Sequence, residues 1–455
     1  MTATAQLRIA RLAATPAVHR AFHWLHIHPL QLRRWQLEIL RIPAPPFGEQ
    51  ARAAWFLEQF HSLGLANPHL DEAGNALAEL PGAPHLGVPG QLAGRGEHLA
   101  SEMWDPQTPP LILLSAHLDT VFPTELPIKP IELEPRIVAP GACDNAAGLS
   151  GLLALAAAMR HAELAPAVPI LFAANVGEEG EGDLRGMRHL FTASPYASRI
   201  AAAIALEGGG SSAVVTRALA SRRFRVTVTG PGGHSWVDAG AANPILVLAR
   251  ALLALESLDL PQDEPRTTLN VGQISGGTSI NSIPESATAL LDLRSTDSTR
   301  LHEAELALRD TLERWVLDPR EPHPPRSDPE SQVGGPGSLG RGGRPNPGRS
   351  PTLAIQTIGD RPGGALPDDA PLLATLRAVD RHLSLRTEPG LGSTDANIPL
   401  SRGIPAIAIG AGGVGGGIHT LHEWYDPTGR TAALRRILLT LLDAAQTAAR
   451  PAESP

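Results

Sequence analysis

Three stretches of sequence decide the fold: LILLSAHLD (111–119), NAAGLSGLLALAAAMRHA (145–162) and PILFAANVGEE (169–179). The first and third contain short apolar runs typical of buried strands. The second has the length of a helix and consists mainly of small residues and leucine. A strand, a helix and a second strand in this order form a crossover unit with parallel strands. The sequence therefore predicts an α/β fold.

Acidic and histidine residues appear where apolar runs of the sequence stop. Ligands in open α/β sheets bind beyond the carboxyl ends of the strands, so we expect these side chains to converge. Carboxylates and imidazoles that meet in one cleft indicate a metal site. The residues are His117 and Asp119, Glu178 and Glu179, Glu207, and His419.

Length and composition limit the classes of protein to consider. A chain of 455 residues allows two or three domains. The net charge of -8, with no long run of one sign, argues against a nucleic-acid partner. Without a run of roughly 18 apolar residues or a leader-like N-terminus, we expect a cytoplasmic protein with no membrane partner. The single cysteine, Cys143, fits a reducing compartment.

The sequence changes character after Glu207. RRFRVTVTG (222–230) and ESATALLDLRS (285–295) alternate with period two, and a helical stretch follows each of them. This β-α-β-α order predicts an α+β domain, residues 214–364, inserted into a catalytic domain formed by residues 1–213 and 365–455. Residues 318–351 are rich in Pro, Gly, Arg and Ser, which predicts a flexible loop.

Several of the polar residues also have simpler explanations. His117 and Asp119 are two apart at a strand end, so their side chains leave the same face and can address one metal. Asp144 opens a helix, and a carboxylate at that place has a simpler explanation, because it can act as an N-cap without binding a metal. Glu178 and Glu179 could divide metal binding and proton transfer between them, although such a pair is often just solvated surface.

The chain resembles a family of di-zinc peptidases and deacylases that includes aminoacylase, carboxypeptidase G and peptidase T. The resemblance covers about residues 36–445, and the peptidase T and dipeptidase members look most similar. It implies a zinc-exopeptidase-like sheet with helices on both faces, plus an inserted ferredoxin-like domain that acts as lid and dimer interface. The motifs are ILLSAHLDTV (112–121), GACDNAAG (141–148), GEEG (177–180), ALEGG (205–209), GPGGHSW (230–236), GSTDAN (392–397) and IHTLHEW (418–424).

The resemblance assigns metal ligands. It implies two Zn²⁺ ions per chain, for which Co²⁺ or Mn²⁺ could substitute, bridged by Asp144. His117 and Glu207 would complete the first site, and Glu179 and His419 the second. Glu207 stands where the family often has Asp. His422 departs from the family pattern, which places the ligand four residues before Glu423 and so favours His419.

The resemblance also assigns catalytic roles. Glu178 would be the general base, and Asp119 would orient the His117 ring. A cis peptide bond is expected between Asp144 and Asn145. We interpret Cys143 as a packing residue.

Three residues of the insert are candidate substrate contacts. The resemblance implies that His234, supplied by the partner subunit of a homodimer, stabilises the oxyanion, with Asn281 nearby and Arg294 binding a substrate carboxylate. Taken alone, His234 could be a polar loop residue and Arg294 a solvent-facing strand residue.

These features predict a metal-dependent hydrolase of amide bonds, specifically an exopeptidase acting on short peptides. An N-acyl-amino-acid deacylase would need the same metals and base, so its substrates remain an alternative. A catalytically silent metal-binding protein is a third possibility. It usually lacks the base or the bridge, and this sequence has both Glu178 and Asp144.

Overall fold

The computed structural model describes residues 2–83, 109–317 and 350–449. The chain divides into two compact units. The first comprises Met1–Leu219 and Arg361–Pro455, and the second comprises Ala220–Asp360. The predicted flexible loop, 318–351, lies outside the described residues except for its last two. No helix within the described ranges is long and apolar enough to cross a membrane.

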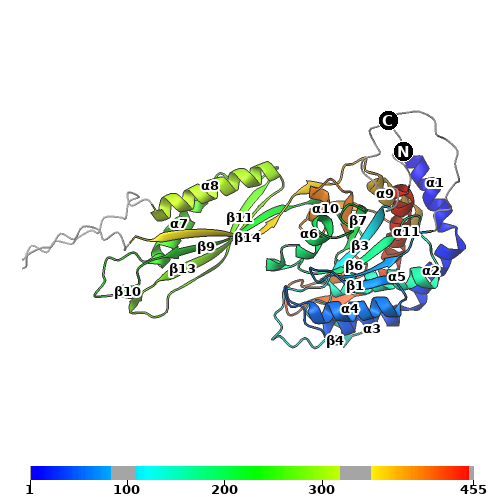
Figure 1. The fold of residues 1–455 in the computed structure, drawn as a ribbon, viewed down its shortest axis with the longest axis horizontal. Coiled ribbons are helices and arrows are strands. Elements are labelled where there is room, and N and C mark those ends of the chain that lie inside the picture. The colour runs from blue at the N-terminus through cyan, green and yellow to red at the C-terminus, as the bar shows by residue number, and fades with distance from the viewer. Residues whose placement is uncertain (1, 84–108, 318–349, 450–455) are drawn as a thin grey trace, which may run out of the picture. The chain divides into compact units, whose positions relative to one another are not determined.

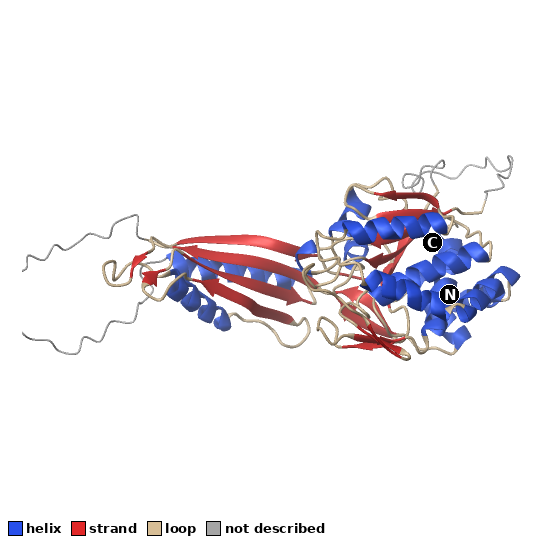
Figure 2. Cartoon of the chain, turned by 90° about the horizontal axis from the view of Figure 1, so that it is seen from below, coloured by secondary structure: helices blue, strands red, loops and turns tan. Residues whose placement is uncertain are grey.

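The first unit is built on a nine-stranded mixed sheet, which confirms the predicted α/β class (Figures 1 and 2). Its order is β1-β2-β6-β3-β7-β17-β8-β15, and β16 pairs with β8. The central strands β6, β3, β7 and β17 run parallel to their neighbours in this group. The strands are β1 (Ala66–Leu70), β2 (Ala76–Leu80), β3 (Leu111–His117), β6 (Ile170–Asn175), β7 (Ile200–Leu206), β8 (Ala213–Ala218), β15 (Gly364–Ala365), β16 (Glu388–Gly392) and β17 (Ala406–Ile409).

Helices pack along this sheet, and α5 is the helix predicted from residues 145–162. Its small residues are required because a Cβ atom on Gly148 would lie 2.8 Å from the Leu206 carbonyl oxygen. The helices are α1 (Thr2–Ala13), α2 (Pro16–Ile27), α3 (Pro29–Leu40), α4 (Gln50–Ser62), α5 (Ala146–His161), η1 (Gly180–Gly182), α6 (Arg185–Thr192), α9 (Pro371–Leu383), α10 (Asn397–Ser401) and α11 (Arg430–Ala448). A small sheet in the order β18-β19-β5-β4 adds β4 (Ile131–Leu133), β5 (Arg136–Val138), β18 (Val414–Gly416) and β19 (Trp424–Asp426).

The second unit has a four-stranded antiparallel sheet in the order β11-β13-β9-β14. Along the chain its elements follow the β-α-β-β-α-β order of a ferredoxin-like domain. Phe224, Val226 and Val228 of β9 form its core together with Leu248 of α7 and Leu308 of α8. Its elements are β9 (Ala220–Thr229), β10 (Gly233–His234), α7 (Pro244–Ala254), η2 (Leu255–Ser257), β11 (Thr267–Gly276), β12 (Ser282–Ile283), β13 (Ser286–Ser295), α8 (Ser298–Leu317) and β14 (Thr352–Arg361).

Two details of the predicted insert are wrong. Residues 214–219 belong to the first unit, because β8 pairs with β17, β15 and β16 in the large sheet. Arg361 to Gly364 also belong to the first unit. In addition, the predicted β-α-β-α order omits β11. That strand lies at the edge of its sheet, and most of its residues are exposed, so it carries no buried alternating face for the sequence to reveal.

Candidate metal centre

His117 is the last residue of β3, and its ring is completely buried. Its Nδ1 atom lies 3.1 Å from the backbone oxygen of Asp119. The Asp119 carboxylate accepts the N–H groups of Glu178 at 3.0 Å and Glu179 at 2.6 Å. Burial opposes ionisation of Asp119, but the contact with His117 and the two N–H groups outweigh it and lower its pKa. Asp119 therefore ties the segment after β3 to the segment after β6.

The carboxylate of Asp144 faces a histidine with each of its two oxygens. His117 Nε2 lies 3.0 Å from Asp144 Oδ1, and His419 Nε2 lies 3.1 Å from Asp144 Oδ2. A glutamate completes each group, because Glu207 Oε1 is 3.3 Å from His117 Nε2 and Glu179 Oε1 is 3.0 Å from His419 Nε2. Asp144 thus lies between two sets of nitrogen and oxygen ligands.

The local backbone explains why Asp144 is available for this position. The N-cap of α5 is Asn145, whose side chain accepts the N–H of Gly148 at 3.2 Å. Asp144 therefore does not serve as the cap, which was the simpler explanation of its place in the sequence. The peptide bond between Asp144 and Asn145 is cis, as expected.

An unusual backbone conformation positions the second histidine, His419. His419 has a φ of 64°, in the left-handed region that residues other than glycine rarely adopt. The exposed His422 donates its backbone N–H to Thr420 Oγ1. It is His419, not His422, that the structure brings to Asp144 and Glu179.

The site concentrates negative charge. Burial raises the pKa of Glu207, and the neighbouring Asp144 and Glu179 raise it further. Hydrogen bonds that His419 donates to the carboxylates of Asp144 and Glu179 raise its pKa to about 10. Within the described chain, Glu207 Oε2 is buried and has no hydrogen-bond partner. A buried oxygen without a partner is costly, so a cation at this position would remove an existing penalty.

Sequence reasoning missed Arg361, which contacts the predicted base. Arg361 Nη1 donates to Glu178 Oε1 at 2.9 Å and to Ser393 Oγ at 3.1 Å, and Nη2 donates to the backbone oxygen of Glu178. Burial raises the pKa of Glu178, and Arg361 opposes that rise. A single arginine at the end of β14 gives no sequence signal, because its partner is far away along the chain.

Glu423 and Asp395 lie in two of the sequence motifs, IHTLHEW and GSTDAN, and the sequence alone predicts no function for either side chain. Glu423 is buried, and its carboxylate accepts the backbone N–H groups of Gly141, Cys143 and Asp144. Asp395 accepts the Asn175 side-chain amide at 2.8 Å, and burial raises its pKa to about 7. Cys143 packs in the core, and its Sγ accepts the N–H of Gly209 at 3.1 Å.

The three candidate substrate contacts all lie in the second unit. His234 is exposed in β10, and its Nδ1 accepts the N–H of Trp236 at 3.2 Å. Asn281 lies beside it, because the Asn281 backbone oxygen accepts the N–H of Ser235 at 3.0 Å. Arg294 is held elsewhere on β13, where its Nε donates to Asp292 Oδ2 at 2.6 Å. The structure therefore groups the first two of these residues but not the third with them.

Known proteins place this arrangement in a family. The sequence model of peptidase family M20/M25/M40 matches residues 113–444, a range that contains every residue of the site. The chain belongs to this family. Among curated relatives of this M20/M25/M40 chain, a probable carboxypeptidase of Aspergillus clavatus is 31% identical over 204 residues, which are 41% of this chain and 44% of that protein. A probable carboxypeptidase of Talaromyces marneffei is 27% identical over 233 residues, 46% of this chain and 51% of that protein. The chain thus spans about half the length of these relatives.

Solved structures share the fold of the M20/M25/M40 chain over nearly its whole length. A tripeptidase of Staphylococcus aureus has a TM-score of 0.64 and 20% identity, with 92% of this chain and 98% of that chain covered. Human carnosine dipeptidase 1 has a TM-score of 0.63 and 13% identity, with 94% of this chain and 100% of that chain covered. At these identities the likeness concerns the fold alone.

Proposed function

We propose that this protein is a metal-dependent exopeptidase that hydrolyses a terminal amide bond of short peptides. The observation that carries the proposal is the Asp144 carboxylate, whose two oxygens lie 3.0 and 3.1 Å from the Nε2 atoms of His117 and His419. A carboxylate between two such ligand sets is suited to bridge a pair of divalent ions. The family and the peptidases that share its fold support the reaction class.

The residues fit a pair of Zn²⁺ ions. The described residues form three groups, and within each group the possible ligand atoms lie within 4.8 Å of one another. The groups are His117, Asp144 and Glu207; His117, Glu178 and Glu179; and Asp144, Glu179 and His419. They offer nitrogen and oxygen without thiolate, which suits zinc and leaves Co²⁺ or Mn²⁺ possible as substitutes. Such a cation would give Glu207 Oε2 the partner that it lacks among the described residues. His117 and Glu207 would hold one ion, Glu179 and His419 the other, and Asp144 both.

When bound, the ions would stabilise the negative charge that develops on the substrate carbonyl oxygen and make water more acidic. Glu178 takes the proton from the attacking water and passes it to the leaving amine. Arg361 holds Glu178 Oε1, which leaves Oε2 to accept the proton. Asp119 fixes the backbone of Glu178 and Glu179 relative to His117. The base and the ligands therefore keep one geometry during the reaction.

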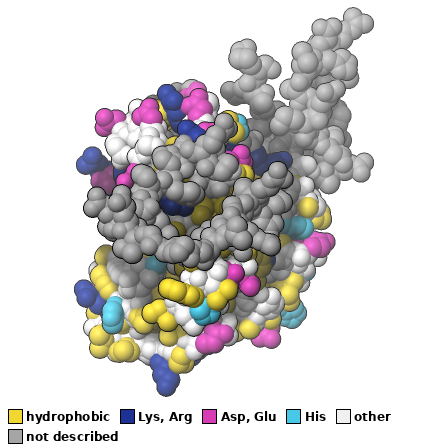
Figure 3. Space-filling view, turned by 90° about the vertical axis from the view of Figure 1, so that its left-hand side faces the viewer, with side chains coloured by type: hydrophobic (Ala, Val, Ile, Leu, Met, Phe, Trp, Pro, Cys, Tyr) yellow, Lys and Arg dark blue, Asp and Glu magenta, His cyan; other side chains and the backbone are white. Residues whose placement is uncertain are grey.

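The second unit would supply the remaining contacts as a lid. His234 would stabilise the oxyanion from the partner subunit of a homodimer, with Asn281 beside it, and Arg294 would bind a substrate carboxylate. Exposed apolar side chains support an interface in this unit, since Trp236, Val237 and Ile280 are 85%, 76% and 102% exposed. In Figure 3, apolar side chains (yellow) are visible on the surface next to histidine, acidic and other polar side chains.

The direct test combines metal content, substrate choice and one substitution. We expect the zinc-loaded protein to contain near two ions per chain and to hydrolyse free tripeptides. Glu178→Gln should retain the metal and lower kcat by about 10² to 10⁴, because it removes the proton acceptor. Glu58→Gln, at an exposed position of α4, is the matched control and should leave kcat unchanged.

Two results would contradict this proposal in different ways. An unchanged rate for Glu178→Gln would remove Glu178 as the base. Hydrolysis of N-acetylated amino acids without hydrolysis of peptides would instead favour the deacylase alternative. Absence of any hydrolysis with both ions bound would leave a silent metal-binding protein.

A further inference from the structure

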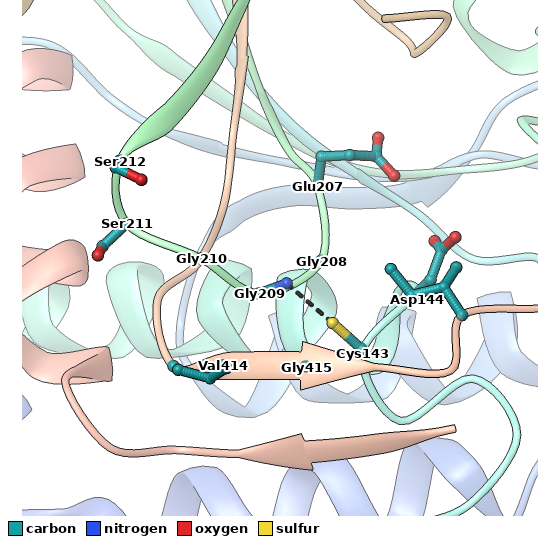
Figure 4. Close-up of a pocket in the computed structure, with 12 residues that line it drawn as sticks. Cys143, Asp144, Glu207, Gly208, Gly209, Gly210, Ser211, Ser212, Val414 and Gly415 are labelled. Atoms are coloured by element: carbon teal, nitrogen blue, oxygen red, sulfur yellow. Dashed lines mark hydrogen bonds between the residues drawn. The ribbon is translucent and has the colours of Figure 1, made fainter. Parts of the chain in front are cut away.

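We infer that a pocket beside Asp144 and Glu207 binds an uncharged, aliphatic side chain of the substrate, next to the scissile bond. The pocket has a volume of about 480 Å³, within the range of roughly 300–1,000 Å³ that is usual for small-molecule sites. Two segments, Gly208–Ser212 and Gly413–Gly415, form most of its wall (Figure 4). This inference rests on the proposed peptidase function and names the class of side chain that the same site accepts.

The wall consists largely of glycine backbone, where a side chain is disfavoured either by a close neighbour or by the backbone conformation. A Cβ atom on Gly415 would lie 2.2 Å from Cys143 Sγ, and one on Gly209 would lie 3.2 Å from the same sulfur. Gly210 has open space around it, but its φ of 98° disfavours any other residue. The glycines therefore keep the pocket open beside the ligands.

Three backbone N–H groups of this wall, those nearest to Glu207, are already used. Gly208 N–H donates to Asn145 Oδ1 at 2.9 Å, Gly209 N–H to Cys143 Sγ at 3.1 Å, and Gly210 N–H to the Gly413 carbonyl oxygen at 3.1 Å. Figure 4 shows the Gly209 contact as a dashed line. An anionic group that entered the pocket would find no free N–H donor on these three residues.

The side chains that line the pocket offer no cation either. Among its described lining residues there is no Lys, Arg or His, and the charged ones are Asp144 and Glu207. An acidic substrate side chain would therefore find no cationic side chain of the protein with which to pair in the pocket. A basic side chain would compete with the metal ions for these two carboxylates. Either charged class is disfavoured.

The remaining lining residues favour apolar contact. Val414 and Ile418 are 54% and 48% exposed, so each offers apolar surface to a ligand in the pocket. Ser211 and Ser212 are exposed where the segment continues away from Glu207 (Figure 4). An aliphatic side chain in the pocket would remove the apolar surface of Val414 and Ile418 from water.

The first experiment measures kcat/KM for two dipeptide series with the zinc-loaded full chain. One series is Leu-Ala, Asp-Ala and Lys-Ala, and the other is Ala-Leu, Ala-Asp and Ala-Lys. We expect leucine to exceed both charged residues at least tenfold in one series. Aspartate or lysine within threefold of leucine in both series would overturn the inference.

The second experiment locates the preference in this pocket. Ser212→Lys should raise the Asp-to-Leu ratio of kcat/KM at least fivefold in the selective series, and Ser212→Asp should raise the Lys-to-Leu ratio. Opposite shifts cannot arise from a general loss of folding. Ser62→Lys, at an exposed serine of α4 outside the pocket, is the matched control and should change neither ratio. Unchanged ratios in both Ser212 variants would overturn the inference.

The outcomes separate this inference from the proposed function. If the zinc-loaded wild-type protein hydrolyses no dipeptide or tripeptide, the peptidase function itself fails. If it hydrolyses dipeptides without regard to side-chain charge, only the pocket assignment fails.

Discussion

Glu423 acts on the site through the backbone. Its Oε1 accepts the N–H groups of Cys143 at 2.7 Å and Asp144 at 2.8 Å, and its Oε2 accepts that of Gly141 at 3.0 Å. These bonds fix the turn from which the Asp144 side chain projects. The side chain of Glu423 thus helps to fix where the Asp144 carboxylate lies.

We predict that Glu423→Gln weakens metal binding. The amide nitrogen cannot accept a hydrogen bond, so at least one N–H group loses its partner, which costs about 1–3 kcal/mol. Zinc titration of the metal-free protein by calorimetry should show at least tenfold lower affinity than for Glu58→Gln. An unchanged affinity would show that the turn holds Asp144 without Glu423.

Cys143 gives a second prediction for a single residue. Burial raises the pKa of its thiol to about 12, so below that pH the unreactive thiol dominates. Alkylation by iodoacetamide at pH 8 should therefore be far slower than in the urea-unfolded chain, as followed by mass spectrometry. Equal rates in the two states would contradict this protection.

The sequence could predict the polar residues at strand ends but not the residues that hold their side chains in place. His117 and Glu207 follow apolar runs, so the rule for parallel sheets placed them at one edge. Arg361 follows a run of mixed polarity and meets Glu178 only after the chain has folded. Contacts of this kind depend on tertiary geometry, which no local pattern encodes.

Among the elements, α9 and α11 are joined by a buried ion pair. Arg436 of α11 donates to both carboxylate oxygens of Asp380 in α9, at 2.6 and 3.0 Å, and to the Ser211 backbone oxygen at 2.6 Å. The Arg436 side chain is completely buried. The pair therefore connects two helices with the segment that borders the pocket.

We predict that Arg436→Met lowers the free energy of unfolding by about 3–5 kcal/mol, because it leaves the Asp380 carboxylate buried without its partner. Urea unfolding measures the change. Arg314→Met is the matched control, since its ion pair with Asp310 in α8 is more than half exposed on both sides and should contribute at most about 1 kcal/mol. A similar loss of unfolding free energy in both variants would show that the buried ion pair stabilises the protein no more than the exposed one does.

Elements with a buried face were predictable, and those without one were not. The apolar runs of β3 and β6 and the small residues of α5 reveal their classes, because each is buried almost throughout. The edge strand β11 has little buried surface, so its pattern carries no period of two. The boundary at residue 214 is misplaced for a different reason: β8 does alternate, but the alternation does not tell which of the two sheets the strand joins.

At the scale of the whole molecule, the open question is whether two chains share each site. The proposal places His234 of one chain in the site of its partner. We therefore predict a dimeric mass by light scattering at working concentration. A monomeric mass with full activity would remove the partner role of His234.

Complementation gives a sharper test of shared sites. His234→Ala and Glu178→Gln should each be inactive alone, but a co-expressed mixture should recover activity, because mixed dimers contain one site with both residues. Recovery is measured with a tripeptide and compared with the separately purified variants. If the mixture contains mixed dimers but recovers no activity, His234 does not act in the site of the partner subunit.

The order of the ligands along the chain has a consequence for synthesis. His117, Asp144, Glu179 and Glu207 precede the second unit, whereas His419 and Glu423 follow it. During translation, the four earlier ligands leave the ribosome while the second histidine and the support of the Asp144 turn have yet to be made. Under the proposed function, a nascent chain cannot assemble both ion sites until the second unit and His419 have been translated, so metal loading would follow the synthesis of both units.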